Sequence, residues 1–109
     1  MLMHKARTMS RKSLKVSKKA AWERIEALRL TGTLSWLAGK QSKAIEHWKK
    51  AVETAKEYGG KIELAHTYKE IADRLETNIS KYHEFNGKSL VQIRNMANEI
   101  YHEIQIDLS

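Results

Sequence analysis

The chain has 109 residues, of which 41% are hydrophobic and 30% charged, so it has the composition of one small globular domain and not of a disordered segment. It contains no cysteine, which excludes disulfides, thiolate metal sites and thiol nucleophiles. It also contains no proline, which favours an all-helical chain because proline breaks helix interiors. No apolar run approaches the ~18 residues of a membrane-spanning helix, and we expect a cytoplasmic protein.

The net charge of +7 comes entirely from the start of the chain. Residues 1–22 carry seven basic side chains and no acid, whereas residues 23–109 carry 13 basic and 13 acidic ones. We therefore expect a basic N-terminal segment over residues 1–20, partly a helical remnant or a tail, and a charge-balanced helical domain over residues 21–109.

The basic segment allows four interpretations. The segment is either the degenerate end of an upstream helical repeat, a solvated tail, an electrostatic contact for nucleic acid or acidic lipid, or an organellar transit peptide. The apolar stripe that favours the first comprises Leu2, Met3, Ala6 and Met9. The side chains that would make the electrostatic contact are Arg7, Arg11, Lys12, Lys15, Lys18 and Lys19.

Four helices are predicted in chain order, over about residues 21–38, 42–58, 62–79 and 89–106. Gly39 and the Gly59-Gly60 pair are expected to end the first two, because glycine adopts the left-handed conformation of a helix C-cap. A loop is predicted over residues 80–88, and Ser89 is a candidate N-cap for the last helix.

Apolar spacing predicts how each helix is buried. The second, third and fourth helices each have one apolar face, made respectively of Ala44, Trp48, Ala51, Val52 and Ala55; of Leu64, Tyr68, Ile71, Ala72 and Leu75; and of Leu90, Ile93, Ala97, Ile100 and Ile104. The first helix has two, with Ile25, Leu28 and Trp36 on one side and Leu30, Leu34 and Leu37 on the other. A helix that is apolar on two sides is expected to lie between neighbouring helices.

The stretch from Leu28 to Ala51 resembles a tetratricopeptide repeat, a helix–turn–helix unit of 34 residues. The residues that match its small, turn and large aromatic positions are Gly32, Gly39, Ala44, Trp48 and Ala51. A weaker second unit is suggested by Tyr68, Ile71, Ala72, Leu75, Ala97, Tyr101 and Ile104. Thr31 and Ser35 depart from the usual pattern, and the spacing between the two units is 40 residues instead of 34.

The resemblance covers roughly residues 22–106 and implies an all-α stack of about two antiparallel hairpins. The sequence of residues 44–75 is also similar to the C-terminal repeat regions of large ATPase-linked cyclase and kinase signalling proteins. The likeness implies a scaffold whose first helices line a groove for a protein or peptide. The candidate groove residues are Arg29, Thr33, Trp36, His66, Tyr68 and Lys69. Because about three repeats are normally needed for stability, we also expect self-association through an open stacking face, or a place in a longer array.

Two Glu-x-x-His pairs, Glu63 with His66 and Glu99 with His102, have the spacing of a di-iron site. Their angular positions predict that they point away from the apolar faces, so we expect no metal and no cofactor. No nucleophile motif or phosphate-binding loop is present, and we expect no enzyme activity.

The sequence therefore favours a non-catalytic protein-interaction module. The alternative is a small basic nucleic-acid-binding protein that uses residues 1–22. A third interpretation is a C-terminal fragment of a larger signalling regulator.

Overall fold

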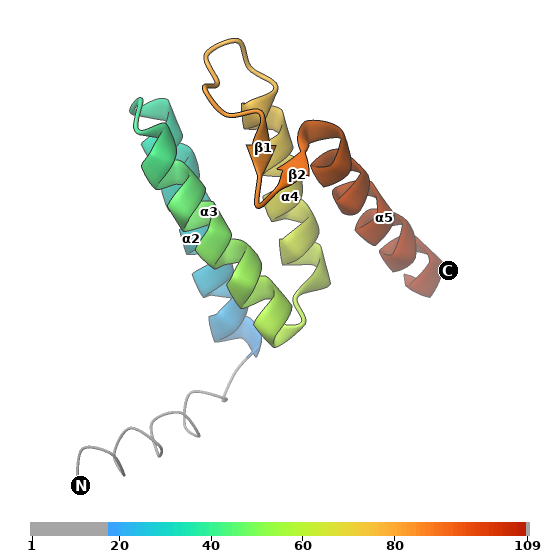
Figure 1. The fold of residues 1–109 in the computed structure, drawn as a ribbon. Helices are drawn as coiled ribbons and strands as arrows, with labels where there is room; N and C mark the ends of the chain where they lie inside the picture. The colour runs from blue at the N-terminus through green and yellow to red at the C-terminus, as the bar shows by residue number, and fades with distance from the viewer. Residues whose placement is uncertain (1–17, 109) are drawn as a thin grey trace, which may run out of the picture.

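The computed structural model describes residues 18–108, and the side chains of residues 19–105, as four helices and one short hairpin (Figure 1). The elements are α2 (Lys18–Leu37), α3 (Gln41–Tyr58), α4 (Lys61–Leu75), β1 (Glu84–Phe85), β2 (Lys88–Ser89) and α5 (Leu90–Leu108). The predicted all-α class is confirmed. The predictions made for residues 1–17 lie outside the described residues.

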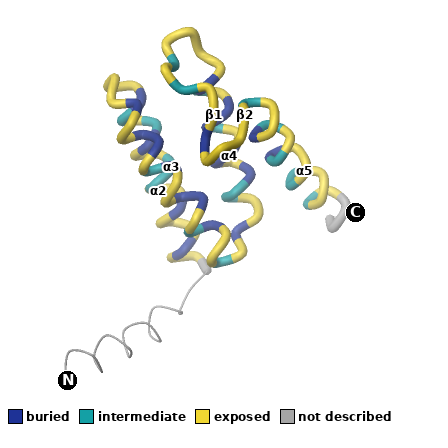
Figure 2. Tube along the Cα trace, in the orientation of Figure 1, coloured by how far each residue is buried: buried dark blue, intermediate teal, exposed yellow. Residues whose placement is uncertain are grey.

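The helices form two antiparallel hairpins placed side by side. Helix α3 runs back along α2, α4 lies against both of them, and α5 runs back along α4 on the side away from α2 (Figure 1). Buried residues gather on the helix faces that point toward one another (Figure 2). Each helix therefore depends on its neighbours for the burial of its apolar face.

The helix ends follow the predicted glycine positions. Gly39 and Gly59 both have a left-handed backbone, with φ of 81° and 69°. The Gly60 N–H donates to the carbonyl oxygen of Ala55 at 2.9 Å, which satisfies a carbonyl that the end of α3 would leave free. At the start of α5, the backbone N–H of Gln92 donates to Oγ of Ser89 at 3.2 Å, and Oε1 of Gln92 accepts from the N–H of Ser89 at 2.8 Å. The predicted N-cap is confirmed as a reciprocal capping box.

Two tryptophans form the centre of the larger core cluster. The rings of Trp36 and Trp48 lie 5.5 Å apart between their centroids, tilted by 33°. The cluster continues through α3, α4, the hairpin and α5, with buried Val52, Tyr68, Ile71, Ala72, Leu75, Phe85, Ile93 and Ala97. A smaller cluster of Ile25, Ala51 and Ala55 closes the other end of the α2–α3 hairpin.

Helix α2 approaches α3 closely because Gly32 has no side chain. A Cβ built on Gly32 would lie 2.5 Å from Cδ1 of Trp48 and would also overlap its Nε1. The indole N–H of Trp48 instead donates to the carbonyl oxygen of Arg29 at 3.2 Å, across the space that a side chain would occupy. A small residue on one helix thus faces a large aromatic residue on the next.

The third helix ends earlier than predicted, at Leu75 instead of Ile79. The hydroxyl of Thr77 donates to the carbonyl oxygen of Arg74 at 2.7 Å, and the Thr77 N–H donates to the same oxygen at 3.2 Å. Side chains of this type compete with helical hydrogen bonds and so end the helix. The prediction placed this polar residue inside the helix.

The predicted loop over residues 80–88 contains a β-hairpin. Strands β1 and β2 pair antiparallel, with Phe85 opposite Lys88, and the turn residues Asn86 and Gly87 have φ of 52° and 75°. Two consecutive positive φ values in a two-residue turn define type I′. The hairpin inserts the buried side chain of Phe85 into the larger core cluster, which also contains residues of α4 and α5.

The segment between α4 and β1 is attached to the start of α3 by one buried side chain. The amide of Gln41 donates to the carbonyl oxygen of Ile79 and accepts from the N–H of Lys81, both at 2.8 Å. This side chain thereby satisfies two backbone groups of a segment that forms no regular structure of its own.

The expectation that α2 is covered on both sides is wrong for the described residues. Leu30, Leu34 and Leu37 are 48%, 67% and 61% exposed, whereas Ile25 and Trp36 on the opposite side are buried. The helix stands at the outer edge of the four-helix arrangement, so one of its two apolar faces points to solvent in the part of the chain that is described.

Candidate functional site

The candidate site is a depression between α2 and α4, the first helices of the two hairpins. It has a volume of about 250 Å³ and is lined by Ile25, Glu26 and Arg29 from α2 and by Glu63 and His66 from α4. Four of these five side chains are polar or ionisable. Because the volume is below the usual ~300–1,000 Å³ and most of the lining side chains carry polar or ionisable groups, the depression suits side chains of a peptide better than a buried small molecule.

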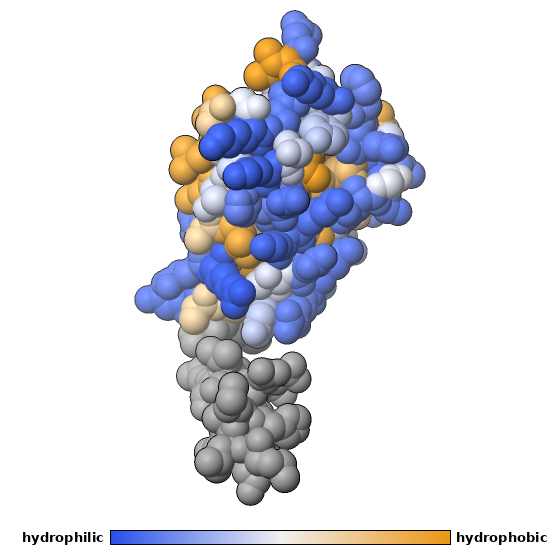
Figure 3. Space-filling view, turned by 60° about the vertical axis from the view of Figure 1, so that its left-hand side comes forward, coloured by the Kyte–Doolittle hydropathy of each residue, from blue (hydrophilic) through white to orange (hydrophobic). Residues whose placement is uncertain are grey.

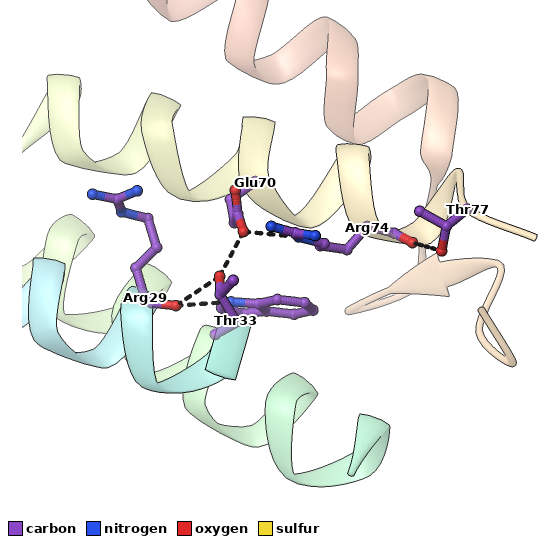
Figure 4. A network of polar contacts seen from close by, with 6 residues as sticks. Arg29, Thr33, Glu70, Arg74 and Thr77 are labelled. Carbon is purple, nitrogen blue, oxygen red and sulfur yellow. Dashed lines mark hydrogen bonds and ion pairs between the residues drawn. The ribbon is translucent and has the colours of Figure 1, made fainter. Parts of the chain in front are cut away.

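A polar network forms the wall of the same inter-helix junction. The hydroxyl of Thr33 on α2 donates to Oε2 of Glu70 on α4 at 2.5 Å, and Nε of Arg74 donates to the same oxygen at 3.0 Å (Figure 4). Figure 4 shows Arg29 one turn before Thr33, on the same side of α2. These contacts fix the relative position of the two helices that line the depression.

The carboxyl group of Glu70 carries a perturbed pKa. Burial raises the pKa of Glu70, but hydrogen bonds from Thr33 and Arg74, and the positive charges of Arg74 and Arg29, lower it by more. The net result is a pKa below the ordinary carboxyl value, so Glu70 is ionised at neutral pH. The charge is therefore a fixed part of the junction between α2 and α4.

Helix α5 contributes an aromatic side chain on the far side of α4. The rings of His66 and Tyr101 lie 5.8 Å apart, tilted by 46°. Burial raises the pKa of the Tyr101 phenol, an effect that the charge of Arg29 opposes and the charge of Asp73 reinforces. His66 thus stands at the centre of a surface that extends from α2 across α4 to α5.

Two of the six predicted groove residues belong to the core. Trp36 is 1% exposed and Tyr68 is 4% exposed, so neither offers a surface to a partner. They were predicted from the resemblance, in which first helices line a groove, but both side chains pack in the larger core cluster. That part of the prediction is corrected.

The other four predicted groove residues lie on or near the surface. Arg29 and His66 line the depression, and Thr33 is half-buried in the network with Glu70. Lys69 is exposed on α4 but does not line the depression.

Glu26 and Glu63 were not predicted as lining residues, nor was Trp22 predicted as their neighbour. Trp22 is 42% exposed and lies one helical turn before Glu26. Its indole also reaches the start of α4, because a Cβ on Gly60 would lie 3.3 Å from Nε1 of Trp22. Glu26 and Glu63 each lie three residues before a predicted groove residue, Arg29 and His66 respectively. Because residues three or four apart share a helix face, this spacing could have predicted both as lining residues.

The two Glu-x-x-His pairs do not converge. His66, Glu99 and His102 are exposed and Glu63 is half-buried, in agreement with the predicted direction of these side chains. Within residues 18–108, no three or more His, Asp or Glu side chains come together as a metal site would require.

The predicted electrostatic contact falls mainly outside the described residues. Arg7, Arg11, Lys12 and Lys15 precede residue 18, and Lys18 is the first residue of α2. Lys19 is exposed on α2. Contact of these side chains with nucleic acid stays a prediction.

Comparison with known proteins adds no relative: no family model, no curated protein and no solved structure matches this chain. The tetratricopeptide resemblance and the likeness to signalling proteins therefore stay predictions. In the described part of the chain, no helix combines the length and apolar character needed to cross a membrane.

Proposed function

We propose that this chain is a non-catalytic protein-interaction module that binds an extended peptide or a helix of another protein along the junction of α2 and α4. The observation that carries the proposal is the depression lined by Glu26, Arg29, Glu63 and His66, with Trp22, 42% exposed, one helical turn before Glu26. Tryptophan and arginine side chains of this kind dominate the binding energy of many protein interfaces.

The charges at the site indicate the chemistry of the partner. Arg29 is only loosely paired with Glu26, at 3.9 Å, and its side chain is 23% exposed. A guanidinium in this position is available to a partner carboxylate, while Glu26 and Glu63 favour basic groups beside it. The best partner is thus a peptide with an apolar residue for Trp22 and alternating acidic and basic residues.

The proposal is tested by selecting peptides from a random display library with the full-length chain and measuring their affinity by fluorescence anisotropy. Trp22→Ser and Arg29→Gln should each weaken binding of a selected peptide by about tenfold or more, which corresponds to roughly 1.4 kcal/mol. The matched control is Lys50→Gln, which removes one exposed positive charge from α3 outside the site.

Thermal melts of all variants establish that the fold is retained. A library that yields no binding peptide, or peptides whose affinity responds equally to Lys50→Gln and Arg29→Gln, would reject the proposal.

A further inference from the structure

The exposed apolar face of α2 is separate from the depression and follows a regular spacing. The residues that share this face lie three and four apart, at Ala20, Glu23, Ala27, Leu30, Leu34 and Leu37. This is the spacing of the contact positions in paired helices. The face is uneven along its length, with small side chains in the first half and leucines in the second.

We propose that the chain forms a two-fold homodimer in which α2 pairs antiparallel with α2 of a second copy through this leucine face. The leucine face is defined as the side of α2 that carries the six residues just named. In Figure 3, which turns the left-hand side of Figure 1 toward the viewer, orange residues interrupted by blue ones lie along the left-hand edge.

The leucine faces of two copies are complementary to each other only when the two α2 helices run antiparallel. Antiparallel pairing about a two-fold axis between residues 28 and 29 sets Ala27 opposite Leu30 and Ala20 opposite Leu37. Each small residue then meets a large one, which is the self-complementarity that a two-fold interface requires. In this arrangement every residue of the leucine face lies level with a leucine-face residue of the other copy.

Parallel pairing is unfavourable for two reasons. It would set alanine opposite alanine, which leaves the first half of the interface underpacked. It would also place Glu23 of both copies in one layer, where like charges repel. In the antiparallel arrangement Glu23 lies level with Leu34 of the other copy, and the two carboxylates are far apart.

The size of the face agrees with a dimer of modest affinity. Leu30, Leu34 and Leu37 are each exposed by about half or more, and with Ala27 they form a patch of a few hundred Å², the size at which exposed apolar patches usually mark an interface. Two 20-residue helices paired along this face bury on the order of 1,000 Å² in total, near the lower limit for specific association. We expect dissociation constants in the micromolar range.

The first test is the molar mass of the full-length chain, by light scattering or sedimentation, from low to high micromolar concentration. The wild-type chain should pass from monomer to dimer and stop there. Leu34→Glu should remain monomeric over the same range. The matched control, Val91→Glu, introduces the same charge at an equally exposed apolar position on α5 and should leave the dimer unchanged, since Val91 and Leu34 are 66% and 67% exposed.

The second test uses the absence of natural cysteine to determine the orientation. An oxidised mixture of Glu23→Cys and Leu34→Cys chains should form a disulfide between one chain of each kind. Glu23→Cys alone should not cross-link, because its two copies would lie about 16 Å apart along the helix axis at 1.5 Å per residue.

Three results would overturn the proposal: a monomer at every concentration, open-ended growth with concentration, or efficient cross-linking of Glu23→Cys alone. A monomeric wild-type chain whose melting temperature falls markedly in Leu34→Glu would show that the leucine face is covered by residues 1–17 of the same chain.

Discussion

At the scale of single residues, the contact between Gly32 and Trp48 sets the distance between α2 and α3. Glycine in a helix interior is normally the less stable choice, by roughly 1 kcal/mol relative to alanine. Here the ring of Trp48 occupies the volume that a Cβ would need, and its indole N–H donates a hydrogen bond to a backbone carbonyl oxygen of α2. The usual preference for alanine is therefore reversed by packing.

We predict that Gly32→Ala lowers the free energy of unfolding by about 1–3 kcal/mol, because a rigid buried ring cannot move away from the new methyl group. Urea unfolding followed by circular dichroism measures the effect. Thr31→Ala is the control, since Thr31 is an exposed neighbour that bonds only within its own helix in the described structure. A gain in stability from Gly32→Ala would show that α2 and α3 are not in close contact.

A second prediction concerns Glu70 and acid. Its pKa is lowered by folding, so the stability that its charge contributes is complete above the ordinary carboxyl pKa of 4.5 and is lost as the pH falls through the lower folded-state value. Glu70→Gln should be less stable than the wild-type chain at pH 7 by about 1.5 kcal/mol, the lower end for hydrogen bonds to a charged group, because Glu70 is only partly buried. The difference should disappear well below pH 4.5.

Urea unfolding at a series of pH values provides the measurement for Glu70. Thr33→Val serves as the comparison variant, because it keeps the carboxylate and removes one of its hydrogen bonds. Thr33→Val should lose less stability than the wild-type chain when the pH is lowered, but more than Glu70→Gln. If the free energies of unfolding of the wild-type chain and Glu70→Gln differed by the same amount at pH 7 and at pH 3, the lowered pKa of Glu70 would be contradicted.

At the scale of elements, the sequence patterns were sufficient for the helices but not for the hairpin. The 3.6-residue spacing of apolar side chains extends over about three turns in α3, and all five residues predicted for its apolar face are buried. Strands of two residues are too short to show the alternation that identifies a strand. The Asn86-Gly87 pair was the available signal, because this dipeptide favours the type I′ turn.

The candidate site was predictable only in part, for a related reason. Helical spacing shows which residues share a face, but it does not show which face a neighbouring helix covers. Of the predicted groove residues, Arg29 and His66 line the depression, whereas Trp36 and Tyr68 are in the core. Depressions form between helices, so their lining depends on contacts between α2 and α4 that one helix alone does not encode.

We predict that the hairpin turn stabilises the α4–α5 half of the molecule. Gly87→Ala should lower the free energy of unfolding by about 1 kcal/mol, because the φ of 75° at this position is unfavourable for a residue with a Cβ. Asn86→Gly should be nearly neutral, since glycine adopts the φ of 52° without strain. Comparison of the two urea midpoints checks the prediction, and equal losses would show that the turn type is not important.

At the scale of the whole molecule, burial is concentrated in one part of the chain. Trp48, Ala65 and Ile71 are fully buried where α3 and α4 meet their neighbours on both sides. Helix α5 contacts α4 and the hairpin, and of its described side chains after Ala97 none is buried. Two ion pairs, from Arg94 to Asp73 at 3.2 Å and to Glu76 at 2.6 Å, attach its first half to α4. The second half contacts α4 through the rings of Tyr101 and His66 and through a longer, exposed ion pair between Glu103 and Lys61 at 3.9 Å.

This distribution predicts how the molecule opens. Amide hydrogen exchange should be slowest around Trp48 and Ile71, where opening requires global unfolding, and faster by orders of magnitude after Ala97, where α5 can fray alone. Native-state exchange with mass spectrometry on the full-length chain gives the profile. Ala97→Gly should accelerate exchange in the second half of α5 and, because Ala97 is buried in the core, should also lower the free energy of global unfolding that the amides around Trp48 report. Uniform protection of all four helices would instead show that the molecule unfolds only as one cooperative unit.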